Sequence, residues 1–140
     1  MLFRSVDSNT FTVNINPSDT NDSIGQYARA TKAQTQEAIA SAKQAFFAWS
    51  RTTPPERSEI LKKASHEILA RKDELGRLLS REEGKTLPEG IGEATRAGQI
   101  FAFFAGEALR LNGEMVPSIR PGVGVEITRE AVGVIGMITP

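Results

Sequence analysis

The chain has 140 residues, a length that fits about one domain, and its 39% hydrophobic and 24% charged residues are typical of a folded globular protein. Collagen-like, mucin-like, coiled-coil and strongly disordered classes are therefore excluded. The 17 Lys and Arg residues balance the 17 Asp and Glu residues, so no overall positive field exists to gather nucleic acid or anionic lipid.

The chain contains no cysteine, which excludes a disulfide, a thiolate metal site and a cysteine nucleophile within these residues. The longest strongly apolar stretch, residues 131–138, is far shorter than the roughly 20 residues that a membrane-spanning helix needs. The first five residues lack the long apolar segment of a signal peptide. We therefore expect the protein in the cytoplasm.

The N-terminal part predicts a β-hairpin. Phe11, Val13 and Ile15 alternate with polar residues, as in a strand with one buried face. Turn-forming residues follow over 16–23, and a second strand is predicted over 24–29.

Three helical segments follow, each with a start signal in which a Thr hydroxyl accepts an early backbone N–H and a residue three positions on reaches back. The pairs are Thr31/Gln34, Thr53/Glu56 and Thr86/Glu89. The first two segments carry apolar stripes that predict faces turned toward a core, and Gly84 is placed to end the second with a left-handed cap. A break of the second segment into two helices at 71–73 is left open. The stripes are Ala38, Ile39, Ala42, Ala45, Phe46 and Trp49 in the first, and Leu61, Ala64, Ile68, Leu75, Leu78 and Leu79 in the second.

The third helical segment, predicted over 87–111, has one face of very small side chains and another of bulky apolar ones. The small face lets another backbone approach closely, so this segment is expected to be a central, well-covered helix. The small residues are Ala94, Gly98, Ala102, Ala105, Gly106 and Ala108, and the bulky ones are Ile91, Phe101, Phe104 and Leu109.

After Gly113 the pattern changes to that of strands. Pro121 and Gly122 stand where a type II turn needs them, and apolar residues then alternate with others over 123–128. From 132 to 138 the sequence is apolar on both faces, as in a strand covered by helices on both sides. Such a strand needs parallel neighbours, so we expect the chain to be the N-terminal portion of a larger protein.

Most side chains that could act in catalysis or metal binding are predicted to have simpler structural roles. His66 is predicted to be solvated, and the carboxylates of 82–83, Glu89 and Glu93 are predicted to cap helices or face solvent rather than form an acid–base pair. No spacing of His or Cys suggests a metal site. Arg96 shares a helix face with Gln99, and two interpretations stay open for it: an anion-binding residue or an ordinary surface arginine.

Several strings taken together resemble the NAD(P)-dependent aldehyde dehydrogenase family, in family order and spacing. The resemblance covers nearly the whole chain, from about Phe11 onward, and lies closest to the α-ketoglutaric and succinic semialdehyde branch. The strings are Ala45-Phe46-Phe47-Ala48-Trp49, Pro55-Glu56-Arg57 to Leu61, Glu83-Gly84-Lys85-Thr86, Phe103-Phe104-Ala105-Gly106-Glu107-Ala108 and Glu130 to Pro140.

The resemblance implies an α/β fold class, with this chain as the N-terminal part of the aldehyde dehydrogenase fold. Residues 1–117 would form the N-terminal hairpin and helices of the cofactor-binding domain. Residues 118–131 would be an oligomerisation strand, and 132–140 the first strand of a Rossmann-like nucleotide-binding sheet. A homo-oligomer, dimer or tetramer, is implied for the full-length protein.

The implied reaction is oxidation of an aldehyde to the carboxylic acid with NAD or NADP. The family uses a Cys thiolate as nucleophile, a Glu-activated water and an oxyanion-holding Asn, and none of these is present here. No catalytic residue is therefore assigned, and the chain alone is expected to be inactive. In the family, the segment matching Ile138, Thr139 and Pro140 lies against the nicotinamide, which suggests cofactor-binding residues.

Arg96 matches a position that borders the substrate entrance tunnel in relatives. With Gln99 one turn on, it implies substrate binding through a carboxylate, as in α-ketoglutaric or succinic semialdehyde. The alternative is a non-catalytic assembly or interaction module whose strand at 122–130 pairs with a partner's sheet edge. Encoding DNA that continues in frame past Pro140 into Trp-Asn and a later Cys would favour the enzyme.

Overall fold

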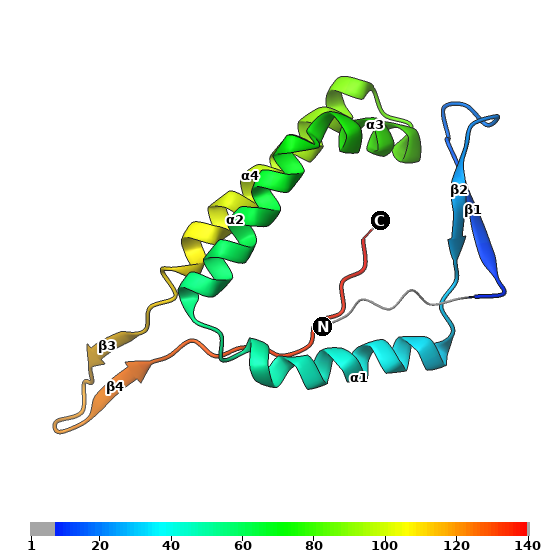
Figure 1. Cartoon of the computed structure of the whole chain (residues 1–140). Helices are drawn as coiled ribbons and strands as arrows, with labels where there is room; N and C mark the ends of the chain where they lie inside the picture. The colour runs from blue at the N-terminus through cyan, green and yellow to red at the C-terminus, as the bar shows by residue number, and fades with distance from the viewer. Residues whose placement is uncertain (1–7, 140) are drawn as a thin grey trace.

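The computed structural model describes residues 8–139, which form four helices and four short strands (Figure 1). No helix in this part of the chain is long and apolar enough to cross a membrane. The elements in order are β1 (Phe11–Ile15), β2 (Ser23–Ala28), α1 (Lys32–Trp49), α2 (Pro54–Ala70), α3 (Lys72–Glu83), α4 (Leu87–Ala108), β3 (Glu114–Pro117) and β4 (Gly124–Ile127).

The packed part of the fold is a layer of three helices in which α2 lies along α4 and α3 crosses its first half (Figure 1). Ala94, Ala105 and Ala108 of α4 are buried, which confirms that its small face admits close neighbours at these positions, whereas Ala102 of the predicted face is exposed. Ser65 of α2 is 2% exposed, and its hydroxyl donates to the Gly98 carbonyl at 2.8 Å. This bond crosses directly from one helix to the backbone of the other.

The crossing of α3 and α4 leaves no room for side chains at two glycines. A Cβ added to Gly76 would lie 2.6 Å from the Ile91 Cα. A Cβ added to Gly90 would lie 2.3 Å from the Gly76 carbonyl oxygen. Both distances are shorter than real Cβ contacts, so the helix approach depends on glycine at both positions.

The predicted helix starts and the cap at Gly84 are confirmed, whereas the helix predicted over 87–111 is shorter, because α4 ends at Ala108. The Thr31 hydroxyl accepts from the Gln34 N–H at 3.2 Å, and α1, α2 and α4 all begin with reciprocal capping boxes. Gly84 takes φ 72° and ends α3. The question at 71–73 is also settled, because α2 and α3 are separate helices that meet at Arg71.

The hairpin of β1 and β2 is antiparallel, as predicted, and its loop is tied to the end of α3. The Arg81 guanidinium donates to both carboxylate oxygens of Asp22, at 2.8 and 2.6 Å. Asn14 donates to Glu82 at 3.0 Å. Hydrogen bonds from Arg81, and then from the Asn16 amide, lower the pKa of Asp22 to about 2, so this carboxylate stays charged across the neutral range.

The prediction that the stripe of α1 faces a core is wrong for the described chain. No residue of α1 is buried, and Phe47 is 60% exposed. In Figure 1 this helix lies apart from the α2–α4 layer. The prediction of a well-covered α4 holds for its small face only, because Phe103 and Phe104 are exposed. Among residues 8–139 no element buries Phe47 of α1 or Phe103 and Phe104 of α4.

The C-terminal part contains a second hairpin, formed by β3 and β4. The predicted turn is present, with the Val123 N–H donating to the Arg120 carbonyl at 3.3 Å and Gly122 at φ 78°. β3 was not predicted, and it supplies the partner that β4 requires.

The strand predicted over 132–140 is not formed, because residues 128–139 carry no regular structure. A strand exists only where a neighbour satisfies its backbone N–H and C=O groups, and the described residues supply none for this stretch. The division of the chain into 1–117, 118–131 and 132–140 therefore stays a prediction.

The large apolar side chains left exposed on α1, α4 and the C-terminal stretch predict that the chain purified alone aggregates or stays partly unfolded. Analytical ultracentrifugation should show polydisperse species, and calorimetry should show no single sharp transition. A monodisperse monomer that melts cooperatively would contradict this prediction.

Candidate functional site

The described chain has an open hollow along one side of α4. It is lined by Arg96, Gln99, Ile100, Phe103 and Phe104. These residues recur at spacings of three and four, so one helix face presents them together. The two residues that the sequence singled out for substrate binding, Arg96 and Gln99, therefore lie side by side.

Arg96 is the only basic residue of α4, and it has no ion pair or hydrogen bond within the part of the chain that the structure describes. Its positive charge is exposed. An unpaired guanidinium offers five N–H donors in a planar fork that matches a carboxylate.

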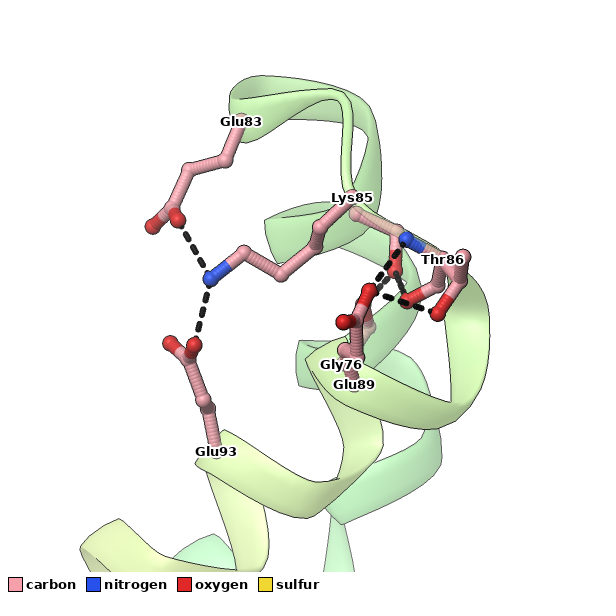
Figure 2. Close-up of polar contacts among 7 residues, drawn as sticks. Gly76, Glu83, Lys85, Thr86, Glu89 and Glu93 are labelled. Carbon is pink, nitrogen blue, oxygen red and sulfur yellow. Dashed lines mark hydrogen bonds and ion pairs between the residues drawn. The ribbon is translucent and has the colours of Figure 1, made fainter.

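The carboxylates of α4 are all engaged elsewhere. Glu89 accepts from the Thr86 N–H at 3.1 Å and from its hydroxyl at 2.7 Å, which lowers the pKa of Glu89. Glu93 is paired with Lys85 at 2.5 Å, and Figure 2 shows Lys85 reaching between Glu83 and Glu93. Glu107 is bound to Arg110.

These pairings have two consequences. The two flanking carboxylates raise the pKa of Lys85, so its charge is fixed and already neutralised. No carboxylate of α4 is left to neutralise Arg96, and the hollow keeps a net positive charge.

The wall of the hollow is aromatic. The rings of Phe103 and Phe104 meet edge to face with centroids 5.3 Å apart, an arrangement that such pairs favour. The sequence assigned Phe104 to the core as bulk, whereas the structure exposes 54% of it. Its spacing of eight from Arg96 is the signal that would have placed it on this face.

Gly92 leaves space next to the guanidinium. It precedes Arg96 by one helical turn on the same side, and a Cβ added to it would meet nothing within 4 Å. The cationic end of the hollow is therefore open to a ligand.

The predicted cofactor residues form no site by themselves. Ile138 is 99% exposed, and Thr139 is also exposed without regular structure around it. Pro140 lies outside the described residues. A nicotinamide needs a preformed concave surface, so the residues present do not fit the cofactor without further structure.

Two of the remaining candidates, His66 and Glu89, have the predicted roles, whereas Glu82, Glu83 and Glu93 bind other side chains instead of capping helices or only facing solvent. His66 is exposed, Glu82 accepts from Asn14, Glu83 and Glu93 hold Lys85, and Glu89 caps α4. Among residues 8–139 no group of three or more His, Asp or Glu side chains is placed to hold a metal ion.

Comparison with known proteins gives one family. The sequence model described as "Aldehyde dehydrogenase family" matches residues 3–140.

Curated relatives are similar over most of the chain. A mitochondrial succinate-semialdehyde dehydrogenase of Arabidopsis thaliana is 38% identical over 92% of the chain and 24% of its own length. An alpha-ketoglutaric semialdehyde dehydrogenase of Bacillus subtilis is 36% identical over 89% of the chain and 26% of its own length. The chain thus spans about a quarter of the length of the curated relatives it matches.

Solved structures similar to this chain are also aldehyde dehydrogenases. An aldehyde dehydrogenase of Brucella melitensis superposes with a TM-score of 0.79 at 32% identity, covering 85% of this chain and 25% of that one. A betaine aldehyde dehydrogenase of Staphylococcus aureus in complex with NAD+ gives 0.82 at 29% identity, covering 91% and 26%.

Proposed function

Because the chain belongs to the aldehyde dehydrogenase family, we propose that it forms part of an oxidoreductase that converts an aldehyde to a carboxylic acid with NAD+ or NADP+. The complete enzyme in this proposal joins the chain to the remaining three quarters of its relatives' length. Family membership supports the reaction class.

The substrate we propose carries a carboxylate at the end remote from the aldehyde. The observation that carries this proposal is the unpaired guanidinium of Arg96, which lies beside Gln99 in an aromatic hollow. A fixed cation with planar donors binds a carboxylate strongly, and the aromatic wall suits a short carbon chain. The names of relatives, semialdehyde dehydrogenases for succinate and alpha-ketoglutarate, support the same class.

The cofactor we propose is a nicotinamide dinucleotide, which supplies the hydride acceptor. A solved neighbour described in complex with NAD+ supports this choice. In the complete enzyme, we propose that Ile138, Thr139 and Pro140 lie at the nicotinamide side once a neighbouring strand orders the stretch. Assays of the complete enzyme with NAD+ and with NADP+ separately would show which of the two cofactors it uses.

The test is aldehyde-dependent formation of NADH or NADPH by the purified complete enzyme, followed by ultraviolet absorbance. We expect turnover of succinic or α-ketoglutaric semialdehyde with at least one of the two cofactors. No reduced cofactor from any carboxylate-bearing or uncharged aldehyde would contradict the proposal.

The 140-residue chain alone is predicted to give no turnover in the same assay. It contains no cysteine, and the reaction proposed for the family depends on a cysteine thiolate. NADH production from an aldehyde by this chain by itself would show that the assignment of the chemistry outside these residues is wrong.

Homo-oligomerisation of the complete enzyme and its location in the cytoplasm stay predictions. The alternative, a non-catalytic assembly module, needed the strand after Gly122 to pair with a partner. In the structure that strand, β4, pairs with β3 of the same chain, so no specific observation favours the alternative.

A further inference from the structure

We propose that Lys85 is a positioning residue that keeps the Arg96 guanidinium free for the substrate carboxylate, by holding the Glu93 carboxylate away from it. This inference rests on the proposed function and adds a residue outside the hollow that determines specificity. Lys85 itself is not expected to touch the substrate, because it is not among the residues that line the hollow.

Glu93 is the carboxylate that would otherwise compete for Arg96. It precedes Arg96 by three residues on α4, and opposite charges at this spacing attract each other on a helix surface. The described chain contains two pairs with the same spacing and order, one of Glu59 with Lys62 and one of Glu107 with Arg110. An ion pair with Arg96 is therefore the ordinary outcome for Glu93, and its absence from the described chain needs a cause.

Lys85 supplies that cause. Its ammonium nitrogen lies 2.5 Å from a carboxylate oxygen of Glu83 and 2.5 Å from one of Glu93, so it bridges the end of α3 and the second turn of α4 (Figure 2). The Lys85 side chain is only 18% exposed, so salt screens this ion pair less than one on the open helix surface. Glu93 accordingly lines a hollow between α3 and α4 rather than the hollow that holds Arg96.

The first test is Lys85→Met in the complete enzyme. Glu93 then loses its partner and can pair with Arg96, and a paired guanidinium is not available to a substrate carboxylate. Because an exposed pair of this kind is weak, we expect the KM for succinic semialdehyde to rise only about 2- to 5-fold. The KM for butanal and both kcat values should not change, because an uncharged aldehyde does not use Arg96 and the contact is remote from the reacting carbon.

Lys85→Arg is the conservative variant. It keeps a cation between the two carboxylates, so the KM for succinic semialdehyde should stay close to that of the unsubstituted enzyme. A rise as large as that of Lys85→Met would contradict the role proposed for the charge.

Two double variants separate release of Glu93 from a general effect of charge or folding. Lys85→Met with Glu93→Gln should restore the KM, because the competitor for Arg96 is gone. Lys85→Met with Glu83→Gln should not, because Glu83 ends α3 and is not a helical neighbour of Arg96. The two double variants have the same net charge, so their difference reports the contact with Arg96 rather than the long-range field. Restoration by both, or by neither, would overturn the inference.

A second measurement does not depend on turnover. Phenylglyoxal modifies free guanidinium groups, and mass spectrometry of peptides from the complete enzyme gives its rate at Arg96. We expect this rate to fall about twofold in Lys85→Met and to recover when Glu93→Gln is added. If the unsubstituted enzyme oxidises no carboxylate-bearing aldehyde, the proposed function fails, whereas the rate of modification still tests the control of Arg96 by Lys85. Equal rates in the unsubstituted enzyme and in Lys85→Met would overturn the inference and leave the proposed function standing.

Discussion

In the complete enzyme, Arg96→Met is expected to raise the KM for succinic semialdehyde by about 10- to 150-fold and to leave the KM for butanal within about twofold. The substitution replaces arginine with an unbranched apolar side chain and removes the only positive charge of α4. A substrate carboxylate would then lose its charged hydrogen-bond donors, whereas an uncharged aldehyde has nothing to lose. Initial-rate kinetics with both substrates measure the difference.

Arg77→Met is the matched control for this substitution. Arg77 is an exposed arginine of α3 that forms no ion pair among the described residues and lines a different hollow. It removes the same charge from the protein, so it corrects for any long-range field. Equal losses on both substrates with Arg96→Met, or no loss on either, would make Arg96 an ordinary surface residue.

Gly90→Ala is expected to destabilise the crossing of α3 and α4. The new methyl group would lie 2.3 Å from the Gly76 carbonyl oxygen, so two backbones must separate. Overpacking costs about 1–3 kcal/mol, and a clash between two backbones falls in the upper part of that range, above the roughly 1 kcal/mol that alanine gains over glycine in a helix. Amide hydrogen exchange across residues 72–108 of the complete enzyme should accelerate at least fivefold.

Gly92→Ala provides the control on the same helix. A Cβ at this position meets nothing within 4 Å in the described chain, so only the higher helix propensity of alanine acts. Exchange across the same residues should stay unchanged or slow down. Equal exchange in both variants would show that the tight crossing does not limit the stability of this layer.

Features that depend on a few neighbouring residues were predicted well from the sequence. Capping at Thr31 and Thr53, the left-handed Gly84 and the turn at Gly122 all formed as expected. Each is determined by local backbone geometry and one or two short-range hydrogen bonds. The close approach predicted for the small face of α4 is also present, because side-chain size alone decides how closely another helix can approach.

Features that depend on distant partners could not be predicted in this way. The stripe on α1 is apolar, but what covers it is not encoded in the helix itself. The stretch 132–138 has the composition of a buried strand, yet it takes no strand structure without a paired neighbour. β3 was missed because its four residues, 114–117, carry too short a pattern to register as a strand.

The same distinction between local and distant determinants applies to the candidate site residues. Arg96 and Gln99 meet in one hollow because helical spacing fixes their relative positions. Ile138 and Thr139 meet nothing, because a site at the end of a strand requires the sheet around it.

The most direct test of the account is the ratio of kcat/KM for succinic semialdehyde over butanal in the unsubstituted complete enzyme, with NAD+ and NADP+ each supplied at saturation. The two aldehydes have the same number of carbons, so the ratio isolates recognition of the carboxylate. Binding of the substrate carboxylate by Arg96 predicts a preference of about 10-fold or more for the semialdehyde with at least one cofactor. A ratio near one, or a preference for butanal, would contradict it.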